Sequence, residues 1–418
     1  MKRKLIAVTL IAILLCLVLG NIIACAPTTT QYDLTITSTA GGSVTNPGED
    51  TFTYDEGEVV NLVAIPDASY RFVNWTGDVD DIANASDATT TITVNGDYSI
   101  RANFEEIPPG SVVYQNPQGY RVEYIVTAYN DGFGIDELRV YQPRPVEWDA
   151  QKDVQVEEVS PPPTDEGVDP MHGNEMYYWQ REGEPLLGEA ISFKIRFTFT
   201  AYETKTNIDP DDVQPYDESE SLYALYTQSE RFIEATDGQI VELANQVADG
   251  ETNPYLLARR FYDYVIDTAS YELLGEGLRG AKALVETGVG ECGDYSALFC
   301  ALCRAVGIPA RPVVGYWAIS GIEQTHVWAE FYVEPFGWIP VDPTVGQAQP
   351  GKREYYFGAM DNERVILNKG FNIQLDPPGP DDYVAPFLQV PLWWFWGSSG
   401  DPGSMHIERT AWTVESIL

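Results

Sequence analysis

The stretch that decides the fold is GVGECGDYSALFCALCRAVGIPARPVVGYW, residues 288–317. A run without proline extends from Cys292 to Ala305, and Gly307 and Pro309 then supply a C-cap and a stop. The pattern predicts a helix over this run, with Cys292 in its first turn. The positive end of the helix macrodipole favours a thiolate over a thiol at such a position. The residue type and its place therefore suit a nucleophile.

A second stretch, THVWAEFYVEPFGWIPVDPT at residues 325–344, alternates apolar and polar residues on both sides of a turn at residues 334–337. The pattern predicts a β-hairpin. His326 and Asp342 are sixteen residues apart, and their midpoint, residue 334, falls at the start of the turn. A hairpin centred there brings both side chains close together on adjacent strands, on one face if the register allows.

The other cysteines and histidines have plainer readings. Cys300 and Cys303 are one helical turn apart, with Cβ atoms about 5 to 6 Å from each other and therefore beyond disulfide range. We expect both to be core thiols. The chain has three histidines, and His172 and His406 lie in DPMHGNE and GSMHIERT, without the context of a catalytic triad.

Three blocks resemble the transglutaminase-like superfamily in order: GECGDYSALFCALCRAVGIPAR, HVWAEFYV and GWIPVDPT. The resemblance covers residues 227–370 and implies a papain-type arrangement. Carried over, Cys292 is the nucleophile, His326 the base and general acid, and Asp342 the group that orients the imidazole. Papain-like enzymes place a glutamine where this chain has Glu286, and an ionised carboxylate cannot donate a hydrogen bond. The second oxyanion donor therefore stays open.

The resemblance implies acyl transfer through a thioester without a cofactor. We expect hydrolysis rather than amine transfer, since no basic or aromatic acceptor pocket can be recognised. The substrate would be a protein or peptide, with cell-wall peptides among the candidates. Two alternatives remain open: a catalytically silent transglutaminase-like fold that serves as a binding or assembly module, and a zinc site built from the same cysteine, histidine and aspartate.

Length and charge narrow the class of protein. The 418 residues suggest two to four domains. Lys and Arg number 25 against 63 Asp and Glu, which gives a net charge of −38. Such a field repels phosphate backbones, so nucleic acid is not an expected partner.

The N-terminus reads as a targeting segment. Lys2, Arg3 and Lys4 precede an apolar run over residues 5–19, which is about the length of a signal-peptide core. The following residues, up to Ile22-Ile23-Ala24-Cys25, resemble a bacterial lipobox. This resemblance implies removal of residues 1–24 and lipidation of Cys25, and it predicts an extracytoplasmic, membrane-anchored protein. The alternative is an ordinary secretory cleavage site.

Residues 32–106 read as short strands separated by turns. The pattern GGSVTNPG…GEVVNLVAIPDASYRFVNWTGD…TITVNGDYSIRANFEE resembles the internalin-type bacterial B-repeat. That resemblance implies a cell-surface module, here expected to be a passive spacer rather than an adhesin. Asp78, Asp80 and Asp81 suggest a solvated acidic loop more than a calcium site, because the spacing of an EF-hand loop is missing.

The remaining chain divides into two predicted parts. Residues 112–215 alternate as in a β-sandwich, and residues 227–418 form the predicted catalytic domain. The aromatic run Trp393-Trp394-Phe395-Trp396 is expected to be a buried final strand packed against the hairpin, with a substrate groove as the alternative. The predicted fold class is multidomain: two N-terminal all-β modules followed by an α+β transglutaminase-like, cysteine-proteinase-type domain.

Overall fold

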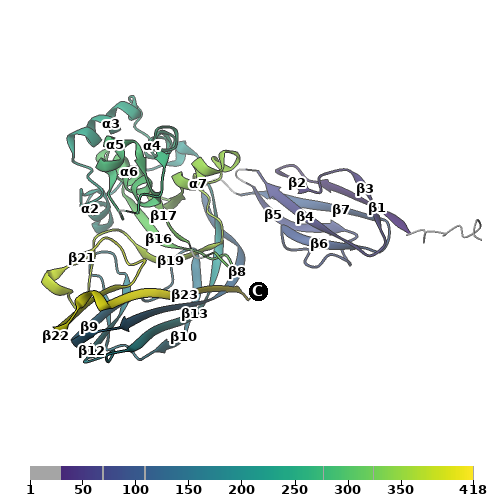
Figure 1. The fold of residues 1–418 in the computed structure, drawn as a ribbon. Helices are drawn as coiled ribbons and strands as arrows, with labels where there is room; N and C mark the ends of the chain where they lie inside the picture. The colour runs from purple at the N-terminus through teal and green to yellow at the C-terminus, as the bar shows by residue number, and fades with distance from the viewer. Residues whose placement is uncertain (1–29, 68–69, 108–109, 276, 323, 418) are drawn as a thin grey trace, which may run out of the picture. The chain divides into compact units, whose positions relative to one another are not determined.

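The computed structural model describes residues 30–67, 70–107, 110–275, 277–322 and 324–417. The chain forms two compact units, residues 1–106 and residues 107–418 (Figure 1). The predicted signal peptide of residues 1–24 and Cys25 lie outside the described residues. Within the described ranges, no helix is long and apolar enough to cross a membrane.

The first unit is all β, as its sequence predicts. One sheet has the strand order β3-β1-β7-β5 and the other the order β2-β4-β6. Alternate residues such as Leu34 and Ile36 of β1 and Ile100 and Ala102 of β7 are buried between the sheets. The strands are β1 (Gln31–Ser38), β2 (Gly42–Asn46), β3 (Thr51–Asp55), β4 (Glu58–Pro66), β5 (Tyr70–Gly77), β6 (Thr89–Val94) and β7 (Tyr98–Glu106).

Two aspartates of the acidic loop make contacts inside this unit. The carboxylate of Asp78 accepts the backbone N–H of Ser99 at 2.9 Å, and the carboxylate of Asp81 accepts the hydroxyl of Tyr98. In the part of the chain that the structure describes, no group of three or more His, Cys, Asp or Glu residues is placed to hold a metal ion. These two carboxylates therefore tie the loop to the start of β7.

The second unit contains a β-sandwich of two four-stranded sheets, with strand orders β10-β13-β8-β23 and β11-β12-β9-β22. Its core is aromatic, as in the contact between Trp179 and Phe193, whose ring centroids are 5.3 Å apart. The strands are β8 (Ser111–Asn130), β9 (Phe133–Pro143), β10 (Gln151–Ser160), β11 (Asp165–Val168), β12 (Glu175–Glu182), β13 (Glu189–Asn207), β22 (Leu392–Gly400) and β23 (Met405–Ser416).

The last two strands complete this sandwich and do not pack on the hairpin as expected from the sequence. Strand β22 pairs with β9, and β23 pairs with β8 along residues 120–130 (Figure 1). The aromatic run thus belongs to the sandwich, whose other strands except β23 come from residues 111–207. Alternation along a strand reveals that one face is buried, but it carries no information about which sheet edge the strand will join.

The other half of the second unit packs helices against a sheet of order β18-β17-β16-β19. Its strands are β16 (Ala310–Trp317), β17 (Thr325–Val333), β18 (Gly337–Val341) and β19 (Arg364–Lys369). The helices are α2 (Ser221–Thr227), α3 (Gly238–Ala248), α4 (Pro254–Thr268), α5 (Ala281–Thr287), α6 (Cys292–Ala305) and α7 (Pro343–Ala348). Two-residue strands are β14 (Ser270–Tyr271), β15 (Val289–Gly290), β20 (Ile373–Gln374) and β21 (Val384–Ala385). Short 3₁₀ turns are η1 (Pro210–Asp212), η2 (Pro350–Lys352), η3 (Pro380–Asp382) and η4 (Pro402–Ser404).

Helix α6 confirms the prediction for residues 292–305. All its residues from Gly293 to Arg304 are buried, because it is covered by α3, α4 and α5 as well as by the sheet. At its end Gly307 has φ +82°, which a side chain would disfavour. The N–H of Ile308 bonds the carbonyl of Cys303, and the N–H of Gly307 bonds that of Arg304. This is the Schellman termination that the glycine predicts.

The predicted hairpin is also present, with a small shift of register. Val333 lies opposite Gly337 and Ala329 opposite Val341, which centres the turn on residue 335 instead of 334. Continued by one residue, this register puts Trp328 opposite Asp342, and His326 lies two residues before Trp328. Because the offset is an even number of residues, both side chains still face the same side of the sheet.

Candidate active site

Two acidic residues fix the place of Cys292, the first residue of α6. Glu291 and Asp294 form a capping box in which each carboxylate accepts the other residue's backbone N–H. The buried Asp294 also accepts the N–H groups of Arg279 and Gly280, both at 2.9 Å. The capping box satisfies the N–H groups of Glu291 and Asp294. The N–H of Cys292 has no intrahelical partner, because Cys292 is the first residue of the helix and no helical carbonyl lies one turn before it.

His326 and Asp342 come from opposite ends of the hairpin. His326 is the second residue of β17, and Asp342 follows β18 as the N-cap of α7, where its Oδ1 accepts the N–H of Val345 at 2.9 Å. The Nε2 atom of His326 lies 2.7 Å from Oδ2 of Asp342. The side chain of Cys292 lies close enough to the same imidazole to help raise its pKa. With Nε2 bound to Asp342, Nδ1 is the ring nitrogen left for the thiol.

Burial and the neighbouring side chains of the site determine the protonation states of His326 and Asp342. Burial by itself would lower the pKa of His326, but Asp342 and the Cys292 thiol together raise it to about 9. Burial would raise the pKa of Asp342, yet His326 and Arg364 hold it well below its usual range. At neutral pH the site therefore contains an imidazolium and an ionised carboxylate.

Arg364 is a member of the site that the sequence did not reveal. Its Nη1 atom lies 2.7 Å from Oδ2 of Asp342, the oxygen that also binds His326. Trp317 and Trp328 stack on the imidazole, with centroids 5.1 and 6.1 Å away and interplanar angles of 24° and 19°. No local pattern in NERVILNK indicates that an arginine at the start of this strand is buried.

Gln389 holds the backbone of the histidine from outside the signature blocks. Its Nε2 atom donates to the carbonyl of Gly315 at 2.7 Å and to that of His326 at 2.9 Å. The side chain is 5% exposed. The segment before β22 thus fixes the two strands at the point where the imidazole projects.

The remaining cysteines are placed as the sequence predicts. Cys300 and Cys303 are free thiols with no exposure, whereas Cys292 is partly exposed. Burial raises the pKa of Cys300 to about 12 and that of Cys303 well above its ordinary value. Of the three, Cys292 alone combines access to solvent with contact to the imidazole.

The other two histidines lie outside the site. Ring nitrogens of His172 contact the carbonyl of Phe371 at 3.0 Å and the hydroxyl of Tyr226 at 3.3 Å. His406 stacks on Tyr129 in the sandwich, with ring centroids 4.9 Å apart. Both make structural contacts.

Glu286 does not reach the site, because it is exposed on α5. Tyr271 lies near Cys292 instead. Strand β14 pairs with β15 so that Tyr271 is opposite Gly290, two residues before Cys292. Its ring contacts the ring of Tyr295 edge to face at 6.2 Å. Burial, and after it the charge of Cys292, raises the pKa of Tyr271 to about 12, so its hydroxyl keeps its proton at neutral pH. Tyr271 is 39% exposed.

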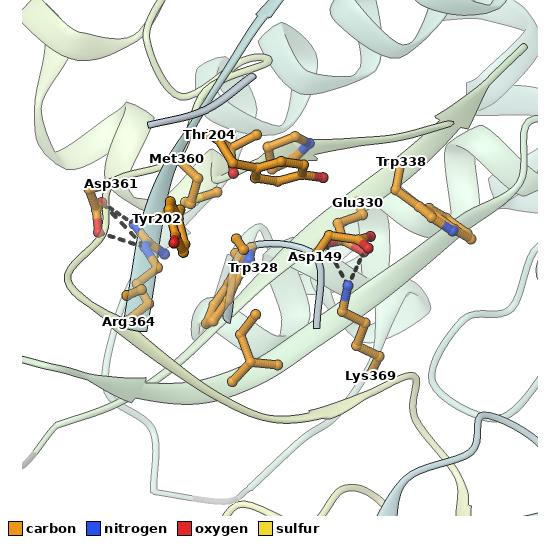
Figure 2. A pocket seen from close by; sticks show the side chains of 15 residues that line it. Asp149, Tyr202, Thr204, Trp328, Glu330, Trp338, Met360, Asp361, Arg364 and Lys369 are labelled. Carbon is orange, nitrogen blue, oxygen red and sulfur yellow. Dashed lines mark hydrogen bonds and ion pairs between the residues drawn. The ribbon is translucent and has the colours of Figure 1, made fainter. Parts of the chain in front are cut away.

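A small cavity adjoins the site on the side of Arg364. Figure 2 shows Trp328 between the Arg364–Asp361 ion pair and a group formed by Asp149, Glu330 and Lys369. Tyr202 and Thr204 of β13 close the cavity from the sandwich. Its volume is about 40 Å³, room for a few water molecules.

Comparison with known families identifies two parts of the chain. Residues 241–343 match the profile of the transglutaminase-like superfamily, and residues 32–108 match that of the divergent InlB B-repeat domain. Residues 241–343 are a transglutaminase-like domain. The predicted fold class, with an all-β start and an α+β transglutaminase-like part, is confirmed.

Relatives share only part of the chain. An uncharacterized protein of Haemophilus influenzae is 31% identical over 135 residues, which cover 26% of this chain and 36% of that protein. A protein-glutamine gamma-glutamyltransferase of Pseudomonas aeruginosa is 34% identical over 71 residues, 15% of this chain and 11% of that protein. The chain therefore spans about a third or less of these two relatives.

Two solved structures match the chain at low sequence identity. A protein of Cytophaga hutchinsonii, described as a "putative cysteine protease", matches with a TM-score of 0.50 and 17% identity, covering 73% of this chain and 93% of that one. The periplasmic domain of TgpA from Pseudomonas aeruginosa matches with a TM-score of 0.31 and 18% identity, covering 57% and 90%. The first of these extends the fold likeness beyond residues 241–343.

Proposed function

We propose that this protein is an extracytoplasmic, lipid-anchored cysteine enzyme that cleaves amide bonds through a thioester, with Cys292, His326 and Asp342 as its triad. The observation that carries the proposal is the arrangement of these three side chains. A partly exposed cysteine at a helix start contacts a buried imidazole, and the other nitrogen of that imidazole lies 2.7 Å from a buried carboxylate.

The proposed reaction uses these three side chains in turn. The thiolate sulfur of Cys292 attacks the carbonyl carbon of an amide and forms a tetrahedral oxyanion. The imidazolium of His326 then gives its proton to the leaving nitrogen, the C–N bond breaks, and an acyl thioester and a free amine result. The neutral imidazole next takes a proton from water, whose oxygen displaces the sulfur and releases a carboxylic acid. Asp342 holds the ring and balances its charge.

The oxyanion needs donors beside the sulfur. The backbone N–H of Cys292 is one, because it has no partner in the helix. The hydroxyl of Tyr271 is our candidate for the second. It retains its proton, and its strand pairs with Val289 and Gly290, which lie three and two residues before Cys292.

Hydrolysis is the proposed outcome, because water resolves a thioester unless a site for an acceptor amine is built. The substrate is proposed to be a protein or peptide, including the peptides of a cell wall. Anchoring through Cys25 would place the enzyme at the membrane, with the B-repeat unit as a spacer.

The test compares purified protein with the Cys292→Ala and Asp342→Asn variants on a peptide-amide library, with amine release and amine incorporation measured together. Cys292→Ala should abolish turnover, and Asp342→Asn should lower kcat on the order of 10³- to 10⁴-fold through a misoriented imidazole. Cys303→Ala, a buried cysteine of the same helix, is the matched control and should retain activity. A wild-type protein that binds a peptide but turns over no amide would favour the silent binding module.

Anchoring is tested separately from chemistry. The wild-type protein should fractionate with membranes and be released by detergent, and Cys25→Ser should leave it soluble or uncleaved. A Cys25→Ser protein of mature size that stays with membranes would contradict the anchor.

A further inference from the structure

Asp342 binds two cations at once, through a single oxygen. Its Oδ2 lies 2.7 Å from Nε2 of His326 and 2.7 Å from Nη1 of Arg364. The side chain of Asp342 has no exposure, and those of His326 and Arg364 are 8% and 4% exposed. Water therefore screens none of these charges well, so the guanidinium and the imidazolium compete for the same carboxylate.

Arg364 is itself held in place. Its Nε and Nη2 atoms bind the carboxylate of Asp361, at 3.1 and 2.9 Å to the nearest oxygen (Figure 2). Its guanidinium lies 4.5 Å from the ring centre of Trp317 and 5.0 Å from that of Trp328. These are the same two rings that stack on His326. One pair of tryptophans thus fixes both cations relative to each other.

We propose that Arg364 is a positioning residue for the cysteine chemistry: it holds the Asp342 carboxylate against His326 and, by sharing its charge, keeps the imidazolium ready to release its proton. Only the expected effect of Arg364 on turnover rests on the proposed function. Its effect on the titration of His326 can be measured in a protein with or without amide-cleaving activity.

The charges that face His326 from every packed element support this role. Asp342 reaches it from the start of α7, Cys292 from α6 and Arg364 from β19, with Asp361 behind Arg364. Asp342 and Cys292 already stabilise the imidazolium. Without the guanidinium, Asp342 would attract it more strongly, and a histidine that holds its proton too tightly is a poor general acid near neutral pH.

The experiment is a titration of ring-labelled histidine by NMR in the full chain, which has three histidines. The double variant Asp361→Asn/Arg364→Met removes both buried charges together, so no unpaired ion is left. We expect the titration midpoint of His326 to rise by about 1 pH unit and kcat to fall about 10-fold or more, with KM little changed. A folded double variant with the wild-type midpoint would overturn the proposal.

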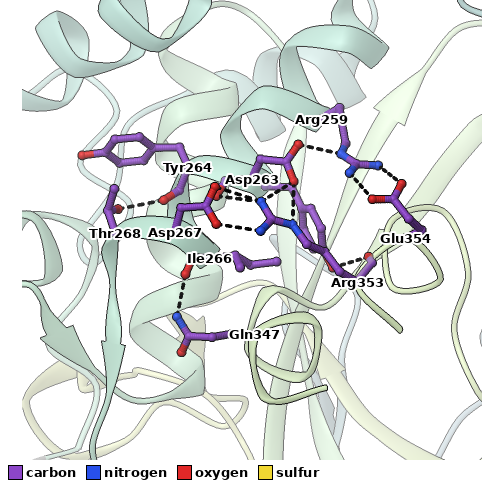
Figure 3. A network of polar contacts seen from close by, with 10 residues as sticks. Arg259, Asp263, Tyr264, Ile266, Asp267, Thr268, Gln347, Arg353 and Glu354 are labelled. Atoms are coloured by element: carbon purple, nitrogen blue, oxygen red, sulfur yellow. Dashed lines mark hydrogen bonds and ion pairs between the residues drawn. The ribbon is translucent and has the colours of Figure 1, made fainter. Parts of the chain in front are cut away.

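The matched control is Arg353→Met. Arg353 also binds two carboxylates, Asp263 and Asp267, each at 2.6 Å, but it lies in a separate network that ties η2 to α4 (Figure 3). Its loss should leave the midpoint of His326 unchanged.

If the double variant does not fold, the variant Arg364→Lys tests the role of Arg364. Lysine at position 364 keeps a cation but cannot bind Asp342 and Asp361 together, since it lacks the planar fork of arginine. Arg364→Lys should raise the midpoint of His326 by a few tenths of a unit and lower kcat. A folded Arg364→Lys protein with wild-type midpoint and turnover would overturn the proposal.

Discussion

Replacing His326 by glutamine should remove a pH-dependent part of the stability. The pKa of His326 is raised from 6.5 to about 9, which corresponds to about 3 kcal/mol in favour of the folded protein. The sign follows from the direction of the shift. Below about pH 6 both the folded and the unfolded histidine are protonated, so the full contribution is present. Above the unfolded pKa of 6.5 it declines, and it is lost once the pH passes about 9.

The assay is urea unfolding of wild type and His326→Gln at several values between pH 6 and 10, followed by tryptophan fluorescence. Nine of the ten tryptophans lie in residues 107–418, so the signal reports the unit that contains the site. Subtracting the unfolding free energy of one protein from that of the other removes the contribution of other titrating groups. The same comparison is made in a Cys292→Ala background, which removes the thiol. There the stability difference between the proteins with and without His326 should decline less with pH, in the same direction. A difference in unfolding free energy that does not change with pH would refute this account of the site.

Two further outcomes follow from burial. Iodoacetamide should label Cys292 in the native protein, while Cys300 and Cys303 should react only after unfolding, as peptide mapping would show; equal labelling of all three would contradict the assignment. Gln389→Leu leaves two carbonyls, including that of His326, without their donor, and should lower the free energy of unfolding by about 2 to 4 kcal/mol. A loss below about 0.5 kcal/mol would show that water replaces the amide there.

The parts of the fold that could be predicted depend on local signals. Helix α6 has its bounds because Glu291, Asp294 and Gly307 satisfy its ends within a few residues of sequence. The hairpin brings His326 to Asp342 because alternation and one turn fix which residues share a face. In each case the information lies within about 20 residues of the feature it determines.

The parts that escaped prediction depend on pairing across the chain. Every residue of β19 is buried, including Arg364 and Lys369, whose charges are balanced by carboxylates on other elements. A window of sequence around a lone arginine predicts exposure, because a buried charge without a partner is unstable. Only the folded chain supplies those partners, and the same is true of the amide of Gln389.

The sandwich and the sheet of order β18-β17-β16-β19 belong to one folded unit, because β16 contributes side chains to the cores on both of its faces. Val313 and Val314 belong to the core beneath the helices, whereas Tyr316 belongs to the core of the sandwich. There the ring of Tyr316 stacks on Trp412 of β23 at 4.0 Å. Trp317, the next residue, turns to the other face and stacks on His326. Strand β23 therefore supports the strand that carries one wall of the candidate active site, so the geometry of that site depends on residues well beyond the three signature blocks.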